Sequence, residues 1–220
     1  MNNRLFAIGD IHGCFDSLKE LVEHKIKLQK NDKLILLGDY IDRGEKSKET
    51  IDFIIQLQEK GYDIVTLLGN HEAMLLDAYV NKDHIFKWIQ NGGSETLKSF
   101  KINSLNDIES KYFKFFKELI YYYSFGDFLF VHAGFNDKSV NPFEDRYSML
   151  WNCQEFYTNP LLINKTIVHG HCLISVSKCK DRIAAKLNTI NIDTGCVFNS
   201  RDGYGVLTAF DCYANRIDIV

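Results

Sequence analysis

Five short apolar runs in this sequence end in polar residues that could bind a metal ion. A glycine stands beside nearly every polar group, which lets the backbone turn sharply and approach a bound ion closely. The groups are Gly9-Asp10-Ile11-His12-Gly13, Gly38-Asp39 with Asp42-Arg43-Gly44, Gly69-Asn70-His71-Glu72, His132-Ala133-Gly134 and His169-Gly170-His171. A single aspartate after a strand is usually a turn former or a helix N-cap. Five such groups at five strand ends favour one shared site instead.

The candidate ligands supply carboxylate or amide oxygen and imidazole nitrogen, but no sulfur. Such a mixture suits Mn²⁺, Fe or Zn²⁺ and argues against a Ca²⁺ cage or a zinc–thiolate site. In two-metal hydrolases the ions lie roughly 3.5–4 Å apart, so one carboxylate has to bridge them. We predict that Asp39 is the bridging ligand, because its strand should lie between the two groups of ligands.

The elements that must position these residues alternate, in the first half of the chain, between apolar strands and amphipathic helices. We predict strands at residues 4–9, 34–37 and 63–68, and helices at residues 14–28 and 47–60. The apolar strands suit a sheet that is covered on both faces. In an open α/β sheet, ligands bind just outside the carboxyl ends of the strands, where these polar groups stand.

The second half is predicted to be helical and then to return to strands. Residues 72–120 read mainly as helix, and strands follow at residues 121–125, 128–132, 166–168, 189–192, 205–211 and 216–219. The turn signals in this half indicate antiparallel pairing. We therefore predict an α+β or α/β fold in which two packed mixed β-sheets form a sandwich flanked by helices. Residues 1–220 should form a single domain, and the helical segment 72–120 should shape its specificity.

Composition and charge narrow the class of protein. The net charge of −3 provides no general attraction to nucleic acid or to an anionic membrane surface. No apolar run approaches the roughly 18 residues that a membrane span requires, and the first residues lack the apolar region of a signal peptide. We expect a cytoplasmic protein without nucleic-acid or membrane partners.

The six cysteines include no C-x-x-C pair. We therefore expect the cysteines to be small buried hydrophobic residues that form neither a disulfide framework nor a structural zinc site.

The order and spacing of the five polar groups resemble the five blocks of the phosphoprotein phosphatase group of calcineurin-like metallophosphoesterases. The resemblance covers roughly residues 5–210. Two further stretches, Trp88-x-x-Asn91-Gly92-Gly93-x-x-Thr96-Leu97 and Asn191-Ile192-Asp193-Thr194-Gly195, resemble its bacterial and phage branch. That branch includes small serine/threonine protein phosphatases and enzymes similar to diadenosine tetraphosphatase.

The resemblance implies two divalent metal ions, with Mn²⁺ expected first. One ion would be held by Asp10, His12 and Asp39, and the other by Asp39, Asn70, His132 and His171. For the last group, the residues alone leave His169 and His171 open, since residues two apart on a strand point to the same face. The family pattern, in which a glycine precedes the ligand, favours His171.

The resemblance also implies the catalytic roles. Arg43 would grip phosphate oxygens, together with Asn70 and His71 in the substrate site, and His71 paired with Asp42 would protonate the leaving oxygen. A water between the metal ions would attack the phosphorus in line, without a phosphoenzyme. Physical chemistry agrees, because a leaving alkoxide needs a proton and a carboxylate behind an imidazole raises its pKa.

One position departs from the pattern. Relatives in this branch often carry Leu-Trp-x-Arg after the fourth block, and that arginine binds phosphate. Here the stretch is Leu150-Trp151-Asn152-Cys153. Loss of a charge-assisted contact would cost on the order of a few kcal/mol. Replacements could come from Arg146, Arg182 or Arg201, and a redox-sensitive thiol at Cys153 is a less favoured interpretation.

The function predicted from the sequence is a metal-dependent phosphatase acting on phosphoserine or phosphothreonine in proteins and on small aryl phosphates. The first alternative is hydrolysis of dinucleoside polyphosphates at the same metal centre. The second is a weakly active phosphate-binding module, and the missing arginine at Cys153 is its only support.

Overall fold

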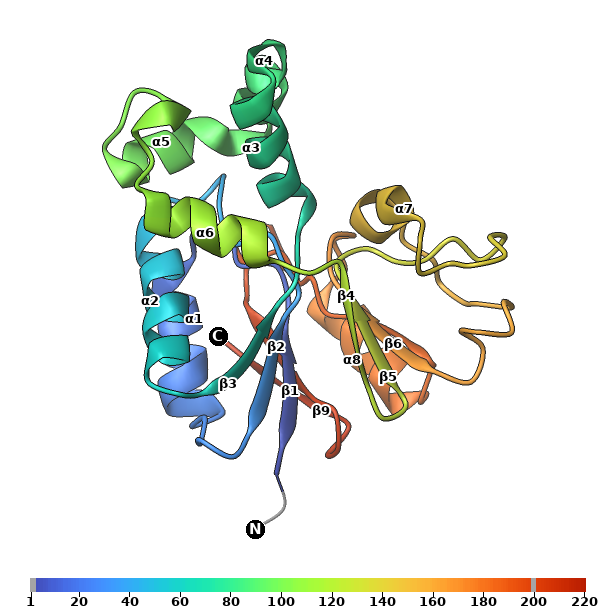
Figure 1. Cartoon of the computed structure of the whole chain (residues 1–220). Helices are drawn as coiled ribbons and strands as arrows, with labels where there is room; N and C mark the ends of the chain where they lie inside the picture. Colours follow the sequence, from blue (N-terminus) through green and yellow to red (C-terminus); the bar gives the residue numbers. More distant parts are fainter. Residues whose placement is uncertain (1–2, 199–200) are drawn as a thin grey trace.

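The computed structural model describes residues 3–198 and 201–220, in which two β-sheets pack together with helices on the outside (Figure 1). The first sheet has the strand order β3-β2-β1-β8-β9, and the second has the order β4-β5-β6-β7. The strands are β1 (Leu5–Ile8), β2 (Lys33–Leu36), β3 (Asp63–Thr66), β4 (Tyr122–Phe125), β5 (Phe128–Val131), β6 (Thr166–His169), β7 (Thr189–Asn191), β8 (Thr208–Asp211) and β9 (Arg216–Ile219). The prediction of two packed mixed sheets flanked by helices is confirmed.

The first sheet is parallel where βαβ units build it. Strand β1 pairs in parallel with β2, and β2 with β3, whereas β8 and β9 join in antiparallel register. Parallel neighbours need a crossover connection, which α1 (Phe15–Glu20) with the π-helical η1 (Leu21–Lys25) and then α2 (Ser47–Glu59) provide. The carboxyl ends of β1, β2 and β3 therefore meet at one edge, where the first three polar groups follow them.

Alternation along the strands builds the layers. Ala7 and Ile35 of the first sheet belong to the core that also holds Phe130 and Val168 of the second sheet. The neighbouring residues Phe6 and Ile8 belong instead to the core beneath the helices. Successive side chains on a strand point to opposite faces, so both faces of the first sheet are buried.

The second sheet corrects one prediction. Strands β4 and β5 form the expected antiparallel hairpin, but β5 pairs in parallel with β6, and β6 with β7. The antiparallel pairing expected across the second half is therefore wrong for β5, β6 and β7, and the last two strands, β8 and β9, belong to the first sheet. The connection from β5 to β6 contains α7 (Arg146–Trp151), and α8 (Val176–Ala184) connects β6 to β7. Such long connections allow parallel pairing, and neither helix was predicted from the sequence.

A helical segment follows β3 and extends beyond the end of the first sheet, with α3 and α4 at the top of Figure 1. Its elements are α3 (Asn70–Val80), η2 (Lys82–His84), α4 (Ile85–Trp88), η3 (Ile89–Gly93), α5 (Ser94–Phe100), η4 (Leu105–Asp107) and α6 (Ser110–Glu118). The backbone bends at Gly92, whose φ is 106°. In the described part of the chain, no helix is both long enough and apolar enough to cross a bilayer.

The cysteines depart from expectation at one pair. Cys153 and Cys172 form a disulfide with a Cα–Cα distance of 6.4 Å, so the expectation of free thiols is wrong for these two residues. They stand 19 residues apart without a recognisable spacing, and the approach of two loops brings them together. The free cysteines are Cys14, Cys179, Cys196 and Cys212, of which only Cys14 is partly exposed.

Candidate metal centre

The two sheets bring the predicted metal ligands to one place. Asp10 and Asp39 follow β1 and β2, and Asn70 begins α3 just after β3. From the second sheet, His132 follows β5 and His171 follows β6. His12 comes from the turn after Asp10. Five of these six side chains are buried, and His171 is half-buried.

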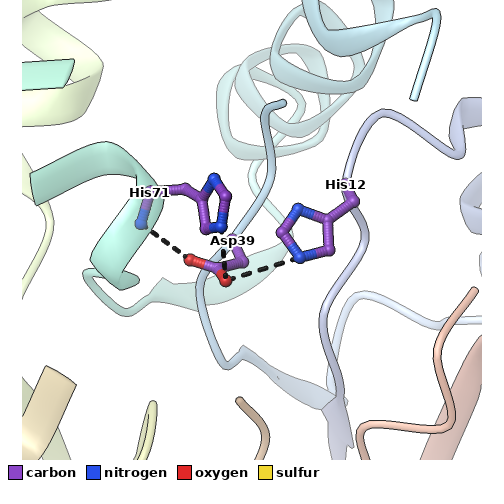
Figure 2. A group of neighbouring side chains, drawn as sticks. All are labelled: His12, Asp39 and His71. Atoms are coloured by element: carbon purple, nitrogen blue, oxygen red, sulfur yellow. Dashed lines mark hydrogen bonds and ion pairs between the residues drawn. The ribbon is translucent and has the colours of Figure 1, made fainter. Parts of the chain in front are cut away.

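Asp39 lies at the centre of this group. Its Oδ2 atom is 3.5 Å from Nε2 of His12 and 3.5 Å from Nε2 of His132. The same oxygen is 3.9 Å from Nε2 of His71, and the backbone N–H of His71 donates to Oδ1 at 3.0 Å (Figure 2). A carboxylate with imidazoles on both sides accords with the predicted role of Asp39 as a bridging ligand.

A second set of donors converges beside Asp39. Nε2 of His132 lies 2.9 Å from Oδ1 of Asn70 and 3.2 Å from Nδ1 of His171. Nδ1 of His171 is in turn 3.0 Å from Oδ1 of Asn70. Three atoms that carry lone pairs thus face one another in a buried site. A divalent cation would satisfy all three at once, because each can donate an electron pair to it.

The backbone contacts of His12 and His132 are made by Nδ1 and leave Nε2 of each ring for other partners. Nδ1 of His12 lies 2.9 Å from the carbonyl oxygen of Ile41, and Nδ1 of His132 lies 3.0 Å from that of Leu37. We assign the ring proton to Nδ1 in both cases, since a carbonyl oxygen only accepts. Burial lowers the pKa of His12 to about 3 and that of His171 to about 4. The imidazoles are therefore neutral at physiological pH, as metal coordination requires.

Carboxyl groups concentrate negative charge in the same region. Burial, together with the charges of Asp193 and Asp39, raises the pKa of Asp10 well above its ordinary value. Burial likewise raises the pKa of Asp193 to about 6. Neutral imidazoles do not compensate these charges, whereas divalent cations would. The residues present therefore fit the cations. In the sequence, Asp193 was noted only within the stretch Asn191-Ile192-Asp193-Thr194-Gly195, and no motif there assigned it to the metal centre.

Several residues of the site have backbone conformations that are rare for residues other than glycine. His12, Asp39, Asp42, Arg43 and His171 all have φ between 46° and 71°, in the left-handed region. This region costs a non-glycine residue roughly 1–2 kcal/mol, and such residues cluster at functional sites.

The buried carboxylate of Glu72 holds one of these turns. Oε2 accepts the N–H groups of Asp39 and Gly69 at 2.9 and 3.2 Å, and Oε1 accepts those of Tyr40 and Ile41 at 2.8 and 3.2 Å. Burial raises the pKa of Glu72 to about 8. In the sequence, Glu72 was noted as part of the group Gly69-Asn70-His71-Glu72, but its role as the hydrogen-bond acceptor for this turn appears only in the structure.

His71 stands behind Asp39 with a carboxylate of its own. Its Nδ1 atom donates to Oδ2 of Asp42 at 2.7 Å, and Asp42 also accepts from Nε1 of Trp88 at 2.9 Å and from Oγ1 of Thr96 at 2.6 Å. Burial lowers the pKa of His71, but Asp39 and Asp42 outweigh it and raise the pKa overall. Nε2 of His71 is buried and has no hydrogen-bond partner among the described residues.

Arg43 lies at the outer side of the cluster. Its side chain is exposed, and Nη1 lies 2.7 Å from Nε2 of His12. Its backbone N–H donates to the carbonyl of Gly92 at 3.2 Å, so the helical segment holds Arg43 as well as Asp42. A Cβ atom at Gly92 would stand only 2.7 Å from that nitrogen, which explains the glycine.

The other three arginines considered from the sequence make contacts elsewhere. The guanidinium of Arg146 lies over the ring of Tyr121, and that of Arg201 lies over the ring of Tyr204. Arg182 donates to the carbonyl of Thr189. His169 also stays apart from the ligands, since its Nδ1 faces the carbonyl of Gly170 at 3.0 Å.

The comparison with protein families agrees with this geometry. The model of the family named calcineurin-like phosphoesterase matches residues 4–220. The chain belongs to this family. Calcineurin-like phosphoesterases require divalent metal ions, which accords with the ligand groups described above. The resemblance stated from the five motifs is thereby confirmed.

Curated relatives of this phosphoesterase carry different activities in their names. A zinc-dependent endopolyphosphatase of Saccharomyces cerevisiae is 35% identical over 41% of this chain and 27% of its own. A serine/threonine-protein phosphatase 2 of Salmonella typhimurium is 28% identical over 87% of both chains. A symmetrical bis(5'-nucleosyl)-tetraphosphatase of Actinobacillus succinogenes is 45% identical over 32% of this chain and 25% of its own. This chain thus spans about a quarter of the first and third relatives.

Solved structures share the phosphoesterase fold. A crystal structure of a putative diadenosine tetraphosphatase superposes with a TM-score of 0.65, covering 99% of this chain and 93% of its own. A yeast serine/threonine phosphatase with similarity to human phosphatase PP5 also reaches 0.65, covering 99% of this chain and 79% of its own. Identities of 18% and 15% limit both comparisons to the fold.

Proposed function

We propose that this calcineurin-like phosphoesterase hydrolyses phosphate monoesters, with phosphoserine and phosphothreonine in proteins as its substrate class. The observation that carries the proposal is the position of His71. Its unpartnered Nε2 atom lies 3.9 Å from the central oxygen of the cluster, and Asp42 supports the opposite nitrogen at 2.7 Å. The Salmonella protein phosphatase, which aligns over 87% of both chains, supports the choice of substrate.

The proposed cofactors are two divalent cations. Their ligands would be Asp10, His12 and Asp39 for one cation and Asp39, Asn70, His132 and His171 for the other. When bound, they supply positive charge for the phosphoryl group and lower the pKa of a water molecule toward neutrality. We propose Mn²⁺ on the basis of the mixed oxygen and nitrogen donors, and Fe and Zn²⁺ suit the same donors.

The chain's own residues would bind the substrate and deliver the proton. The guanidinium of Arg43 is a planar fork of N–H donors that matches the oxygens of a phosphate. His71, protonated, would donate from Nε2 to the leaving alkoxide, while Asp42 stabilises the positive ring and fixes its orientation. Asp42 itself is held by Trp88 and Thr96, so this pair is rigid before substrate binds.

A second candidate function is the hydrolysis of dinucleoside polyphosphates. The observation in its favour is the 45% identity to a bis(5'-nucleosyl)-tetraphosphatase, although the alignment covers only 71 residues. The metal ligands and His71 would serve both reactions. The two functions therefore differ only in the group to which the phosphate is attached in the substrate.

The test is hydrolysis of p-nitrophenyl phosphate in the presence of Mn²⁺. Asp39→Asn and His71→Asn should each abolish turnover. The chain offers matched controls in Asp77→Asn and His84→Asn. Asp77 and His84 form an exposed Asp–His pair, with 2.6 Å between Oδ2 of Asp77 and Nδ1 of His84, and this pair lies away from the cluster. Full activity in Asp39→Asn or His71→Asn would refute the proposal.

The substrate class is tested separately with purified wild-type protein. We expect a higher kcat/KM on phosphoserine and phosphothreonine peptides than on diadenosine tetraphosphate. The opposite order would establish the second candidate function and reject the first.

A further inference from the structure

The Cys153–Cys172 disulfide lies directly beside the candidate metal centre. Cys172 follows His171 in the sequence, and Cys153 stands two residues beyond the end of α7. Both cysteines are half-buried, and both line a cavity of about 230 Å³ together with His169 and Asn191. The bond is therefore not enclosed in a core, and a small thiol can reach it.

The turn that carries His171 is held by the disulfide and by hydrogen bonds, one of which runs from Nδ2 of Asn191 to the carbonyl of Cys172. His171 itself adopts a φ of 64°, and its N–H donates to the carboxylate of Asp10 at 3.1 and 3.2 Å. The N–H of Gly170 donates to the carbonyl of His132 at 2.8 Å. Side-chain support comes from the end of α7, where the ring of Trp151, its last residue, meets that of His171 edge-on at 5.9 Å.

The disulfide connects the chain just after α7 to the same turn. The Sγ atom of Cys153 lies 3.7 Å from the carbonyl oxygen of Gly170, immediately before His171. A left-handed residue persists only where its surroundings hold it. The disulfide is the covalent part of those surroundings, because it fixes Cys172 relative to the end of α7.

We propose that Cys153 and Cys172 form a reversible thiol–disulfide site whose oxidised state holds His171 in position to bind a cation. The proposal rests on the ligand set of the proposed function. The reductant is a dithiol. One of its thiolates attacks a sulfur of the protein disulfide, the S–S bond breaks, and a mixed disulfide forms. The second thiol of the reductant then displaces the protein sulfur, so the protein gains two electrons and two protons and the reductant becomes a disulfide.

Reduction would release the segment after α7 from the turn, and His171 would lose part of its support. Groups that orient a metal ligand typically affect metal affinity by 10-fold to 100-fold. We therefore expect the Kd for Mn²⁺ to rise by about that factor on reduction. His12 and Asp39 lie outside the linked segments and should keep their arrangement.

The experiment first establishes the redox state and then measures metal binding. Protein denatured in N-ethylmaleimide without reductant should gain four adducts by mass, matching its four free cysteines, and six after treatment with dithiothreitol. Native protein, oxidised or reduced and then freed of reductant, is titrated with Mn²⁺ by calorimetry. The reduced form should bind more weakly, and reoxidation should restore the affinity.

Variants separate this effect from general damage. Cys153→Ala and Cys172→Ala should both bind Mn²⁺ as weakly as the reduced wild type and should not respond to dithiothreitol. Cys212→Ala is the matched control, because Cys212 pairs with Leu5 at the opposite end of β1. It should retain the full redox response.

Two results would overturn the proposal: six adducts without reductant, or equal Mn²⁺ affinity of the two forms. Equal affinity with normal phosphatase activity would reject the redox site alone. A redox-dependent Mn²⁺ affinity without phosphatase activity would instead reject the proposed function and leave the redox site standing.

Discussion

The carboxylate of Asp42 lies 2.7 Å from Nδ1 of His71, and both side chains are fully buried. This pair places the opposite nitrogen of His71 toward Asp39 without any other partner in the described chain. The ionised carboxylate favours the protonated imidazole. The relationship therefore suits His71 to its proposed role as a proton donor, with a strength that depends on Asp42.

We predict that Asp42→Asn shifts the pH dependence of phosphatase activity. Asp39 and Asp42 raise the pKa of His71 against the opposing effect of burial. Activity that needs protonated His71 is present below this pKa and is lost as pH rises through it. Removing the charge of Asp42 lowers the pKa, so the alkaline limb of kcat should move to lower pH. Asp77→Asn should leave the limb unchanged, and an unmoved limb in Asp42→Asn would exclude His71 as the acid.

The two histidines at the end of β6, His169 and His171, should differ sharply in metal binding. His171→Asn removes a nitrogen that converges with Asn70 and His132. We expect it to weaken Mn²⁺ binding by more than about 100-fold, beyond the usual effect of a residue outside the ligand set. His169→Asn, measured by the same calorimetry, should change the Kd by less than about 10-fold. The reverse order would assign the ligand to His169.

Arg43→Ala tests whether this arginine is the main phosphate-binding cation. Hydrogen bonds to charged groups contribute about 1.5–3 kcal/mol, which corresponds to a loss of about 10-fold to 160-fold in kcat/KM. Arg146→Ala is the control, since its guanidinium stacks on Tyr121. If Arg146→Ala lost as much activity as Arg43→Ala, the arginine missing at position 153 would have a replacement.

Glu72→Gln should destabilise the metal-free protein above about pH 8, where the carboxyl of Glu72, whose pKa burial raises to about 8, is ionised. Each oxygen of Glu72 now accepts hydrogen bonds from two backbone N–H groups, those of Asp39 and Gly69 or those of Tyr40 and Ile41. The change replaces one of these oxygens with an NH₂ group, which cannot accept from the N–H groups that face it. Leaving a buried donor unsatisfied costs about 1–3 kcal/mol, which urea unfolding would measure as a loss of free energy of unfolding. The exposed Glu59→Gln should have no measurable effect. Equal stability of both variants would remove Glu72 from this role.

The sequence predicted the three parallel strands of the first sheet and the convergence of the candidate ligands because their signals are local. An apolar run followed by glycine and aspartate marks a strand end wherever it occurs, and parallel strands bring their carboxyl ends together. The pairing of β5, β6 and β7 escaped prediction because direction depends on the connections, and α8 was not recognised. The disulfide escaped for a similar reason, since only the tertiary approach of two loops brings Cys153 to Cys172.

Contacts made by single atoms also lay beyond the sequence. Trp88 and Thr96 were noted as part of a resemblance, but their hydrogen bonds to Asp42 follow from how the helical segment packs on the turn after β2. The same holds for Gly92, whose need for φ above zero cannot be read from the letters Asn-Gly-Gly. Its role can be tested directly.

Gly92→Ala should damage the site in two ways that a control can separate. A φ of 106° strains any L-residue, and the new Cβ would stand 2.7 Å from the backbone nitrogen and 2.8 Å from Cγ of Arg43.

Gly126 also has a positive φ, 59°, but a Cβ there meets nothing within 4 Å. Gly126→Ala therefore reports backbone strain alone, of roughly 1–2 kcal/mol. Gly92→Ala adds the further strain of its larger φ and the overlap, for which forced packing typically costs about 1–3 kcal/mol. Because this overlap pushes on Arg43, Gly92→Ala should also raise KM for p-nitrophenyl phosphate, whereas Gly126→Ala should not. An unchanged KM in Gly92→Ala would show that Arg43 keeps its position without the helical segment.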